Sequence, residues 1–360
     1  MARCLPTGDA EAEVISCVQS LKQLMEHEAL FFRRWESTAT PSFFLASLTP
    51  QWRPRVVVIR RGGQIEGVVY TKERRLGWIN TGCVYIDAIL PTIAGPKEQH
   101  ASLLTRAIGV LLSSPTVRGI RVVAPTAWLN GLQIQERGVE EASRPIEAHT
   151  VLPLPRTYDD LVEALGPRGR RNIRYYRRKF EQAGGRFVSH MSDADFKAAA
   201  TSILKSAGTG ADAEKADRFL NMISAVDRPI RCGLQTDDGQ WISILGGWHE
   251  NPSATILFQM NNDVQYPRLS LGVLLKGYVL QNLIVRGTNN IFFWAGVGEP
   301  CDRLTKCIPA TSFYLDKSDL FWVCLRQIVR WTLQFFPPEF RYVSEWIAPS
   351  VPCKADINKT

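Results

Sequence analysis

Residues 266–273 combine residue types that bind phosphate groups. The segment lies between a predicted strand, residues 254–260, and a predicted helix, residues 270–284. Backbone N–H groups at a helix N-terminus have no partner inside the helix, and the helix dipole attracts an anion. The residues that we predict to form a pyrophosphate-binding loop are Arg268, Ser270, Leu271, Gly272 and Val273. Helix capping and packing are the alternative interpretation of the same residues.

Two residues near this loop are candidates for a general base. Asp263 follows the strand 254–260, and His249 follows the strand 241–248. A group at either position, with its pKa near the working pH, removes a proton from an amine or a hydroxyl. We therefore expect Asp263 or His249 to lie next to the loop as the catalytic base. The alternative is that each is a turn former or a hydrogen-bonded structural residue.

The positive charge of the chain is concentrated between residues 166 and 185. This segment holds seven basic residues and one acid, whereas the whole chain has a net charge of +8. Helical spacing places Ile173, Tyr176 and Phe180 on one inward face. The arginines predicted to face solvent and bind an anion are Arg170, Arg174, Arg177 and Arg178. Coenzyme A phosphates, an acidic glycan precursor and tRNA are the candidate anions, and a merely solvated face is the alternative.

The remaining composition limits the kind of protein. Eight cysteines occur without a C-x-x-C pair, and no His or Cys cluster has the spacing of metal ligands, so we expect reduced thiols and no metal. No apolar run is long enough for a membrane span, and the first residues lack an apolar signal segment. We expect a cytoplasmic protein without stable membrane insertion and without a DNA partner. The apolar segment 318–336 predicts a docked helix, and a membrane-surface helix is its alternative.

Apolar patterning predicts the same order of elements twice: a hairpin, a strand, a helix and a strand. After a helix at 11–35, the first set is 55–60 with 65–71, then 76–79, 97–112 and 120–123. The second set is 231–236 with 241–248, then 254–260, 270–284 and 291–294. Pro153 and Pro155 favour a boundary between the sets. We predict a first unit at 1–152, a second at 153–345 that opens with helices, and a C-terminal tail at 346–360.

Two segments carry a resemblance to a known family. They are residues 169–185, GRRNIRYYRRKFEQAGG, and residues 268–296, which run from Arg268 through Val285-Arg286-Gly287 to Gly296. With the order of elements, they resemble GNAT acyltransferases of the CelD-like branch, which is associated with cellulose and exopolysaccharide biosynthesis and related to FemABX-type aminoacyl transferases. The resemblance spans about residues 31–315.

The resemblance implies a fold, a reaction and a donor. The fold is α/β, a tandem GNAT-like fold with mixed central sheets flanked by helices. The implied reaction is transfer of an acyl group, from acetyl-CoA or another acyl-CoA bound in the second unit, to an amine or hydroxyl of a sugar or cell-envelope precursor. The first unit would be structural or bind the acceptor.

Two alternatives stay open. One is aminoacyl transfer from charged tRNA, as in the FemABX-type relatives, with the basic helix as the RNA contact. The other is a catalytically degenerate GNAT-like protein that binds a ligand or partner without turnover. Three residues between Arg268 and Gly272, where the family has two, and the wholly apolar strand 291–294 favour this second alternative.

Overall fold

The computed structural model describes residues 10–87, 92–129, 139–207, 213–294 and 296–317. The chain divides into two units, Met1–Ile146 with Pro309–Thr360 and Glu147–Ile308. The boundary at 146/147 lies six residues before the predicted boundary at 152/153. The end of the second unit differs more from the prediction, because residues 309–317 belong to the first unit and not to the second. The predicted helix 318–336 and the tail 346–360 lie outside the described residues.

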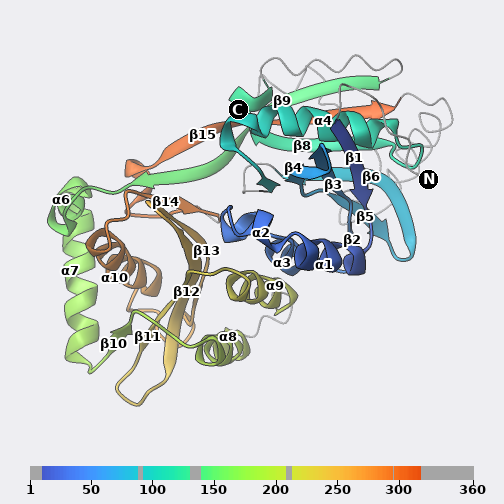
Figure 1. Ribbon diagram of the computed structural model, residues 1–360. Coiled ribbons are helices and arrows are strands. Elements are labelled where there is room, and N and C mark those ends of the chain that lie inside the picture. The colour runs from blue at the N-terminus through green and yellow to red at the C-terminus, as the bar shows by residue number, and fades with distance from the viewer. Residues whose placement is uncertain (1–9, 88–91, 130–138, 208–212, 295, 318–360) are drawn as a thin grey trace, which may run out of the picture. The chain divides into compact units, whose positions relative to one another are not determined.

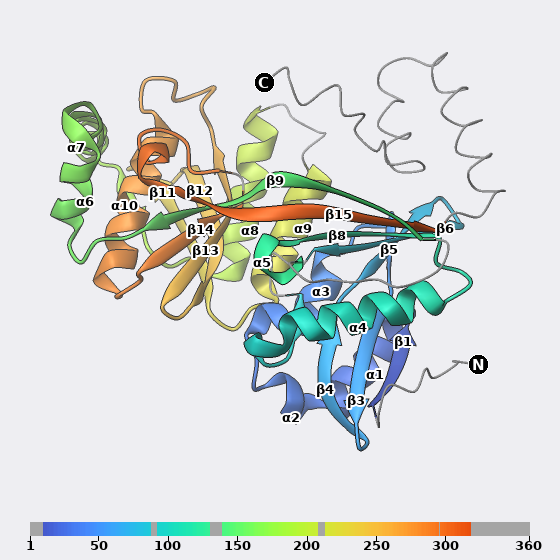
Figure 2. The ribbon, with the colours of Figure 1, turned by 90° about the horizontal axis from the view of Figure 1, so that it is seen from above.

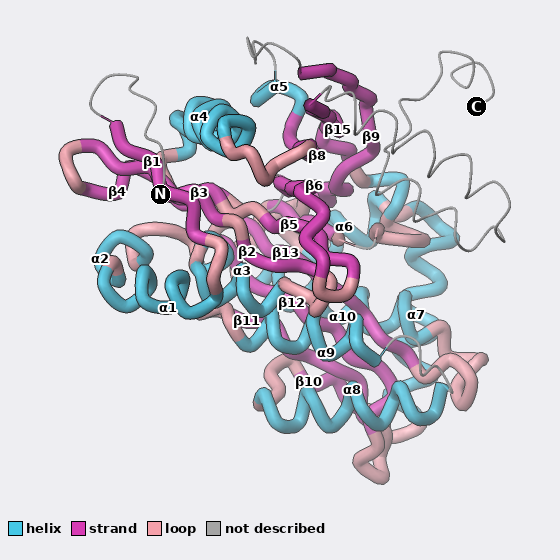
Figure 3. Tube along the Cα trace, turned by 90° about the vertical axis from the view of Figure 1, so that its right-hand side faces the viewer, coloured by secondary structure: helices cyan, strands magenta, loops and turns pink. Residues whose placement is uncertain are grey.

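The first unit contains a four-stranded antiparallel sheet with helices on both faces. Its strand order is β1 (Ala10–Ile15), β3 (Val56–Arg61), β4 (Gln64–Val69) and β7 (Ile93–Ala94). One face packs against α1 (Val18–His27), α2 (Ala29–Phe32) and α3 (Pro41–Ser47), with a short 3-10 turn at Ser37–Ala39. The other face packs against α4 (His100–Ser113), as Figure 3 shows.

The start of the predicted helix 11–35 is wrong, because the chain first forms β1. Glu11 and Glu13 are exposed while Val14 and Ile15 are covered, and the strand pairs with β3 from Ala10 to Ile15. Because side chains alternate between the two faces along a strand, Glu11 and Glu13 point to solvent while the apolar residues contact the core. The helical spacing holds only from Val18 onward.

A second sheet of the first unit lies on the far side of α4. Its strands are β2 (Trp52–Pro54), β5 (Lys72–Leu76), β6 (Ile79–Asp87), β8 (Gly119–Pro125) and, from Ala310 on, β15 (Lys306–Lys317). Figure 2 shows β8 and β15 side by side. A 3-10 turn, Lys97–Gln99, precedes α4, and the short α5 (Thr126–Leu129) follows β8. The helix 97–112 and the strand 120–123 are thereby confirmed.

The predicted strand 76–79 is wrong, because these residues form the turn between β5 and β6. Leu76 pairs with Ile79, and Gly77 has a φ of 60°, which a glycine adopts without strain. The charged stretch before the turn forms β5, which no apolar pattern indicated. Its buried Glu73 accepts hydrogen bonds from Arg53 at 2.9 Å and Arg55 at 2.7 Å.

The second unit is built on one mixed sheet. The strand order is β10 (Arg186–Val188), β11 (Pro229–Gln235), β12 (Trp241–Glu250), β13 (Ser253–Asn261), β14 (Asn290–Phe293) and the end of β9 (Val139–Pro153). Only β13 and β14 run parallel. The predicted hairpin and the strands at 254–260 and 291–294 are confirmed.

Helices cover both faces of this sheet, as Figure 1 shows. On one face lie α6 (Tyr158–Ala164), α7 (Gly166–Gln182) and α10 (Leu271–Val285), and on the other α8 (Asp193–Ala207) and α9 (Ala213–Ser224). A 3-10 turn, Asp302–Leu304, precedes β15. The helix predicted at 270–284 and the helices predicted at the start of the second unit are confirmed. Thr157 caps α6 by accepting the N–H of Asp160 at 3.2 Å. Among the described residues, no helix is long and apolar enough to cross a membrane.

The pairing of β12 with β13 shifts by one residue at Gly246 and Gly247. A side chain at Gly247 has no room, because its Cβ would meet the carbonyl oxygen of Thr255 and lie 3.0 Å from Ile256 Cα. Both obstructing groups belong to the backbone of β13 and cannot rotate away. The bulge therefore requires a glycine at position 247.

We expect Gly247→Ala to lower the free energy of unfolding by about 1–3 kcal/mol, because the added methyl forces two paired strands apart. The control is Gly109→Ala in α4, where nothing lies within 4 Å of the added Cβ and the better helix former raises stability by about 0.5–1 kcal/mol. Urea unfolding followed by circular dichroism measures both. Equal stability of Gly247→Ala and the wild type would contradict the packing described for the bulge.

Candidate functional site

The two parallel strands of the second unit separate partway along their length. β13 pairs with β14 only from Ser253 to Ile256, and the last contact of this pair is the hydrogen bond from Trp294 N–H to Ile256 O at 2.9 Å. The bulge opposite Gly246 and Gly247 falls at the same level of β13. Beyond it, within the described part of the chain, residues 258–261 have a strand partner on the β12 side only. One backbone edge of β13 is left for another group to pair with.

The loop that follows β13 is fixed by a buried asparagine. Asn262 is 1% exposed, and its amide donates to Gln265 Oε1 at 2.8 Å while its Oδ1 accepts the Gln265 N–H. Its backbone N–H donates to Ile242 O at 2.9 Å, and its carbonyl accepts the N–H of Tyr266. The side chain and backbone of this one residue therefore hold the first part of the loop, at Gln265 and Tyr266.

The first turn of α10 contains the predicted loop residues from Ser270 to Val273. Val273 and Leu274 donate to Ser270 O, whereas the N–H groups of Leu271 and Gly272 have no acceptor among the described residues. Ser270 is the N-cap, but its side chain makes no capping bond and its backbone is left-handed, with φ 47° and ψ 57°. A non-glycine residue in that region is strained, and such strain is concentrated at functional sites.

A cluster of amides and one hydroxyl lies beside this turn. Gln259 donates from Nε2 to Asn261 Oδ1 at 3.0 Å and to Gly272 O at 3.4 Å, and Ser243 Oγ donates to Asn261 Oδ1 at 2.7 Å. A Cβ on Gly272 would lie 3.6 Å from Asn261 Nδ2. The side chains at the open end of β13 therefore adjoin the start of α10, although the sequence patterns did not indicate them.

Two cations flank the turn. Arg268 is exposed, and Lys179 of α7 donates from Nζ to the carbonyl of Arg268 at 3.3 Å. The contact brings the last turn of α7 to the beginning of α10, and positive charge from both elements adds to the helix dipole. Lys179 was counted in the basic run, but only the packing of the two helices places it at the loop.

The basic helix divides its charges between solvent and packing. Arg174 and Arg178 are exposed and Arg170 is half-buried, and Ile173 and Phe180 pack inward as predicted. Arg177 was predicted to face solvent, and this prediction is wrong. Its guanidinium lies 4.1 Å from the ring centroid of Tyr278 and 5.5 Å from that of Tyr158, because α7 packs on both α6 and α10.

The expectation that His249 lies next to the loop is wrong. His249 pairs with Ala254 at the start of β13, whereas Asn261 and the loop lie at its end, about 24 Å along the strand. Its neighbour is Arg286 at the end of α10, whose Nη1 lies 3.4 Å from His249 Nε2. Asp263, by contrast, is exposed on the loop directly after the open end of β13.

A lysine that the sequence patterns did not single out lies midway along α10. Lys276 donates from Nζ to the carbonyl of Val297, and its burial lowers its pKa. The nearby Cys301 is buried, which raises the pKa of its thiol to about 11. That thiol is protonated near neutral pH, so Cys301 does not act there as a thiolate nucleophile.

Taken together, the residues at the start of α10 suit an elongated ligand with an anionic end. Free N–H groups, the helix dipole and two cations would attract the anion, and the open edge of β13 offers backbone groups with which an amide-containing chain would pair. The groups that contact such a ligand come from β13, the loop 262–270, α10 and α7.

No protein-family model matches the chain, and no curated protein matches it in sequence. Solved structures resemble it in fold. FemX is 10% identical with a TM-score of 0.56, covering 87% of this chain and 99% of FemX. A conserved protein of unknown function from Bacteroides thetaiotaomicron is 10% identical with a TM-score of 0.55, covering 85% of this chain and 100% of that one. L-PGS from Bacillus licheniformis is 9% identical with a TM-score of 0.51, covering 84% of this chain and 92% of that one.

These likenesses extend over most of the chain at low identity, and they concern the fold. The predicted α/β tandem GNAT-like fold, with mixed central sheets flanked by helices, is confirmed. Although the order of elements recurs, the hairpin of the first unit lies in a separate four-stranded sheet, whereas that of the second lies in the sheet with β13 and β14.

Burial, and then the charges of Arg286 and Arg228, lower the pKa of His249 below its ordinary 6.5. The unfolded chain therefore binds more protons between the two pKa values, and the stability that His249 contributes falls as the pH drops below 6.5. We expect an NMR titration, with the resonance assigned through His249→Gln, to give a pKa below 6.5, and Arg286→Gln to raise it. A wild-type pKa at or above 6.5 would show that this environment is described wrongly.

Proposed function

We propose that the second unit transfers an acyl group, with acetyl as the simplest case, from acyl-CoA to an amine or hydroxyl. The observation that carries this proposal is the separation of β13 from β14 after Ile256, beside the N-terminus of α10. An open strand edge next to an anion-binding helix start suits a donor that has amide groups in its chain and a pyrophosphate at one end.

The residues of the loop fit the phosphate end of the donor. The N–H groups of Leu271 and Gly272 point to no other acceptor in the described structure, and Val273 belongs to the same turn. Arg268 and Lys179 supply charge, and the strained backbone of Ser270 turns the chain into the helix. The extra residue between Arg268 and Gly272, relative to the family spacing, alters which N–H group meets each phosphate.

Bound acyl-CoA supplies an activated thioester carbonyl. The protein would hold the acceptor near it, take up the acceptor's proton and donate a hydrogen bond to the carbonyl oxygen as negative charge develops. The bond from the acceptor to the acyl carbon would replace the C–S bond, and coenzyme A would leave as a thiolate that takes up a proton. Asp263 is the proposed base, because it is exposed directly beyond the open end of β13. His249 has no part in this step, since it lies at the other end of the β12–β13 hairpin.

For the acceptor we propose a sugar or other cell-envelope precursor. This rests on the resemblance of residues 169–185 and 268–296 to the CelD-like branch. The exposed face of α7 supports an anionic precursor, because Arg174 and Arg178 are exposed and Arg170 is half-buried there. Arg177 is excluded from that face by its packing between Tyr158 and Tyr278.

The second candidate function is aminoacyl transfer from charged tRNA. The likeness to FemX over 87% of the chain favours it, together with the basic face of α7. A tRNA donor makes affinity fall steeply with salt, because each neutralised phosphate releases a counterion. Binding of acyl-CoA without thioester cleavage on any acceptor would instead favour a catalytically degenerate binding protein.

We expect acetyl-CoA to bind the purified protein at about 1:1 and Arg268→Glu to abolish this binding, because the substitution replaces a phosphate-facing cation with an anion. The control is Arg228→Glu, which makes the same change in charge on an exposed arginine beside His249, at the far end of β12. Isothermal titration calorimetry, with dephospho-coenzyme A as a second ligand, measures both. Equal affinities of Arg268→Glu and wild type would remove the loop from the proposed function.

A further inference from the structure

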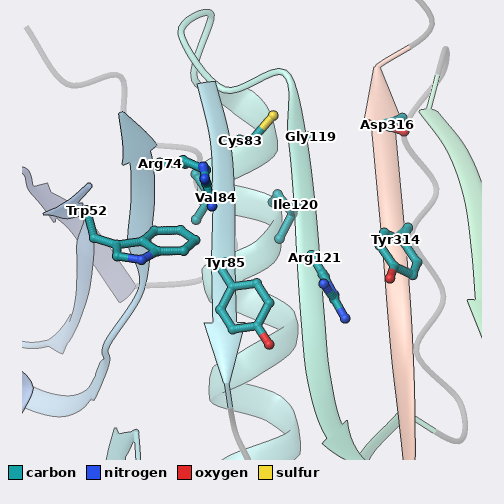
Figure 4. Close-up of a pocket in the computed structure, with 10 residues that line it drawn as sticks. All are labelled: Trp52, Arg74, Cys83, Val84, Tyr85, Gly119, Ile120, Arg121, Tyr314 and Asp316. Carbon is teal, nitrogen blue, oxygen red and sulfur yellow. The ribbon is translucent and has the colours of Figure 1, made fainter. Parts of the chain in front are cut away.

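Aromatic rings hold an arginine that lines a pocket of the first unit. The guanidinium carbon of Arg121 lies 5.3 Å from the ring centroid of Tyr85 and 5.2 Å from that of Tyr314 (Figure 4). A pocket that lies wholly within the second unit is different, because most of its polar side chains have no partner among the described residues. His249 lines that pocket, and we call it the His249 pocket.

The His249 pocket lies between the end of α10 and the sheet of the second unit. Its lining comes from β10 and the chain just after it, from β11, from the end of β12 and from the last turns of α10. The loop proposed for phosphates is at the other end of the same helix. Leu271 and Arg286 lie about 22 Å apart along the axis, at 1.5 Å per residue. The pocket and the loop are therefore two separate places in one unit.

The buried part of the His249 pocket is apolar and uncharged. Ile230, Val279 and Leu283 line it, and all three belong to the core of the second unit. Cys232 lines it too, and burial raises the pKa of its thiol to about 12, so the thiol is neutral. An aliphatic chain placed against these residues leaves water, whereas an ionised group there loses its hydration.

The rest of the lining is polar and contains no carboxylate. The polar side chains are those of Ser189, His190, His249, Asn282 and Arg286. Among the described residues, the one contact that these side chains make with a hydrogen-bonding group joins Arg286 Nη1 and His249 Nε2, 3.4 Å apart. The amide of Asn282 is half-buried and has no partner in the described structure. Several donors therefore face one cavity without an acceptor.

The charge of Arg286 acts on His249 without a nearby anion to balance it. Arg286 makes no ion pair with a carboxylate of the described residues. Burial, and then Arg286 and Arg228, lower the pKa of His249, so its imidazole is neutral at pH 7. The other titratable groups of the pocket are His190 and the neutral thiol of Cys232. A bound anion would offset the repulsion between Arg286 and a protonated His249, so anion binding and protonation would favour each other.

We propose that the His249 pocket binds a small carboxylate with a short aliphatic chain. The carboxylate accepts hydrogen bonds from Arg286 and His249, with the amide of Asn282 as a further donor. The chain lies against Val279 and Leu283. The proposal concerns a site separate from the loop of α10 and does not rest on acyl transfer.

A carboxylate suits this lining better than a phosphate does. A carboxylate has one charge, which matches the single guanidinium of Arg286, and its two oxygens match the paired N–H groups of that guanidinium. A phosphate ester has up to two charges and three acceptor oxygens, and the buried lining offers no donors for the additional oxygen. Because that lining is aliphatic, butyrate should bind more tightly than acetate.

An NMR titration of the full chain with sodium butyrate tests the site, at an ionic strength held constant with sodium chloride. The His249 resonance is assigned through His249→Gln. We expect a saturable change of this resonance, and a rise in the pKa of His249 at saturation, because the bound anion favours the protonated ring. Butyramide, which has the same shape and no charge, is the ligand control and should leave both unchanged.

Two variants test the donors of the pocket. Arg286→Gln should weaken butyrate binding about tenfold or more, because it removes a charge-assisted hydrogen bond. Asn282→Asp should abolish binding, because it replaces a donor with a carboxylate beside Arg286. The matched control is Arg303→Gln, an equal change of charge at an exposed residue of the second unit outside the pocket, which should bind as the wild type does.

Arg268→Glu separates this pocket from the loop of α10, because it should leave the affinity for butyrate unchanged. The proposal would be overturned if butyrate did not saturate the protein at concentrations up to about 50 mM, or if butyramide had the same effect. Undiminished binding by both Arg286→Gln and Asn282→Asp would overturn it as well. Tighter binding of inorganic phosphate than of butyrate would show that the ligand class is wrong.

Discussion

The separation of two parallel strands is the constraint on which the candidate site depends. β13 and β14 are hydrogen-bonded partners only as far as Ile256 and Phe293, and the bulge across from Gly246 and Gly247 lies at the same level. An unpaired strand edge inside a sheet leaves backbone donors and acceptors that need partners. Because α10 begins beside that edge, its free N–H groups adjoin the edge, and an elongated anionic ligand is the occupant that we propose for both.

In both units an arginine side chain makes cation–π contacts with two tyrosine rings. In the second unit Arg177 lies over Tyr278 and Tyr158, and in the first unit Arg121 lies between Tyr85 and Tyr314. A ring offers a cation a partner that leaves its charge available, whereas a carboxylate neutralises it. Arg177 is largely enclosed by α6, α7 and α10 and serves their packing, but Arg121 lines a pocket of the first unit. The same contact thus stabilises a helix interface in one place and holds part of a pocket wall in another.

Local sequence patterns predicted the elements whose apolar spacing and turn residues all lie close together in the sequence. The hairpin before His249 and the apolar helix α10 have such signals, and the loop 266–273 followed from them. β5 was missed because its charged residues are explained only by distant partners, such as Arg53 and Arg55 for Glu73. The predicted position of His249, next to the loop, was wrong. His249 lies at the start of β13 and the loop at its end, and local sequence patterns do not contain the direction of a strand. Lys179 joins the site only through the packing of α7 on α10.

The most direct test of the central claim is hydrogen–deuterium exchange, measured by mass spectrometry, with and without saturating acetyl-CoA. The account predicts slower exchange in peptides that cover residues 258–261 and 270–274, since the donor would pair with the open edge of β13 and with the free N–H groups of α10. Peptides around His249 should exchange at the same rate in both states. Protection confined to the first unit, or no change in either segment at saturation, would contradict the account.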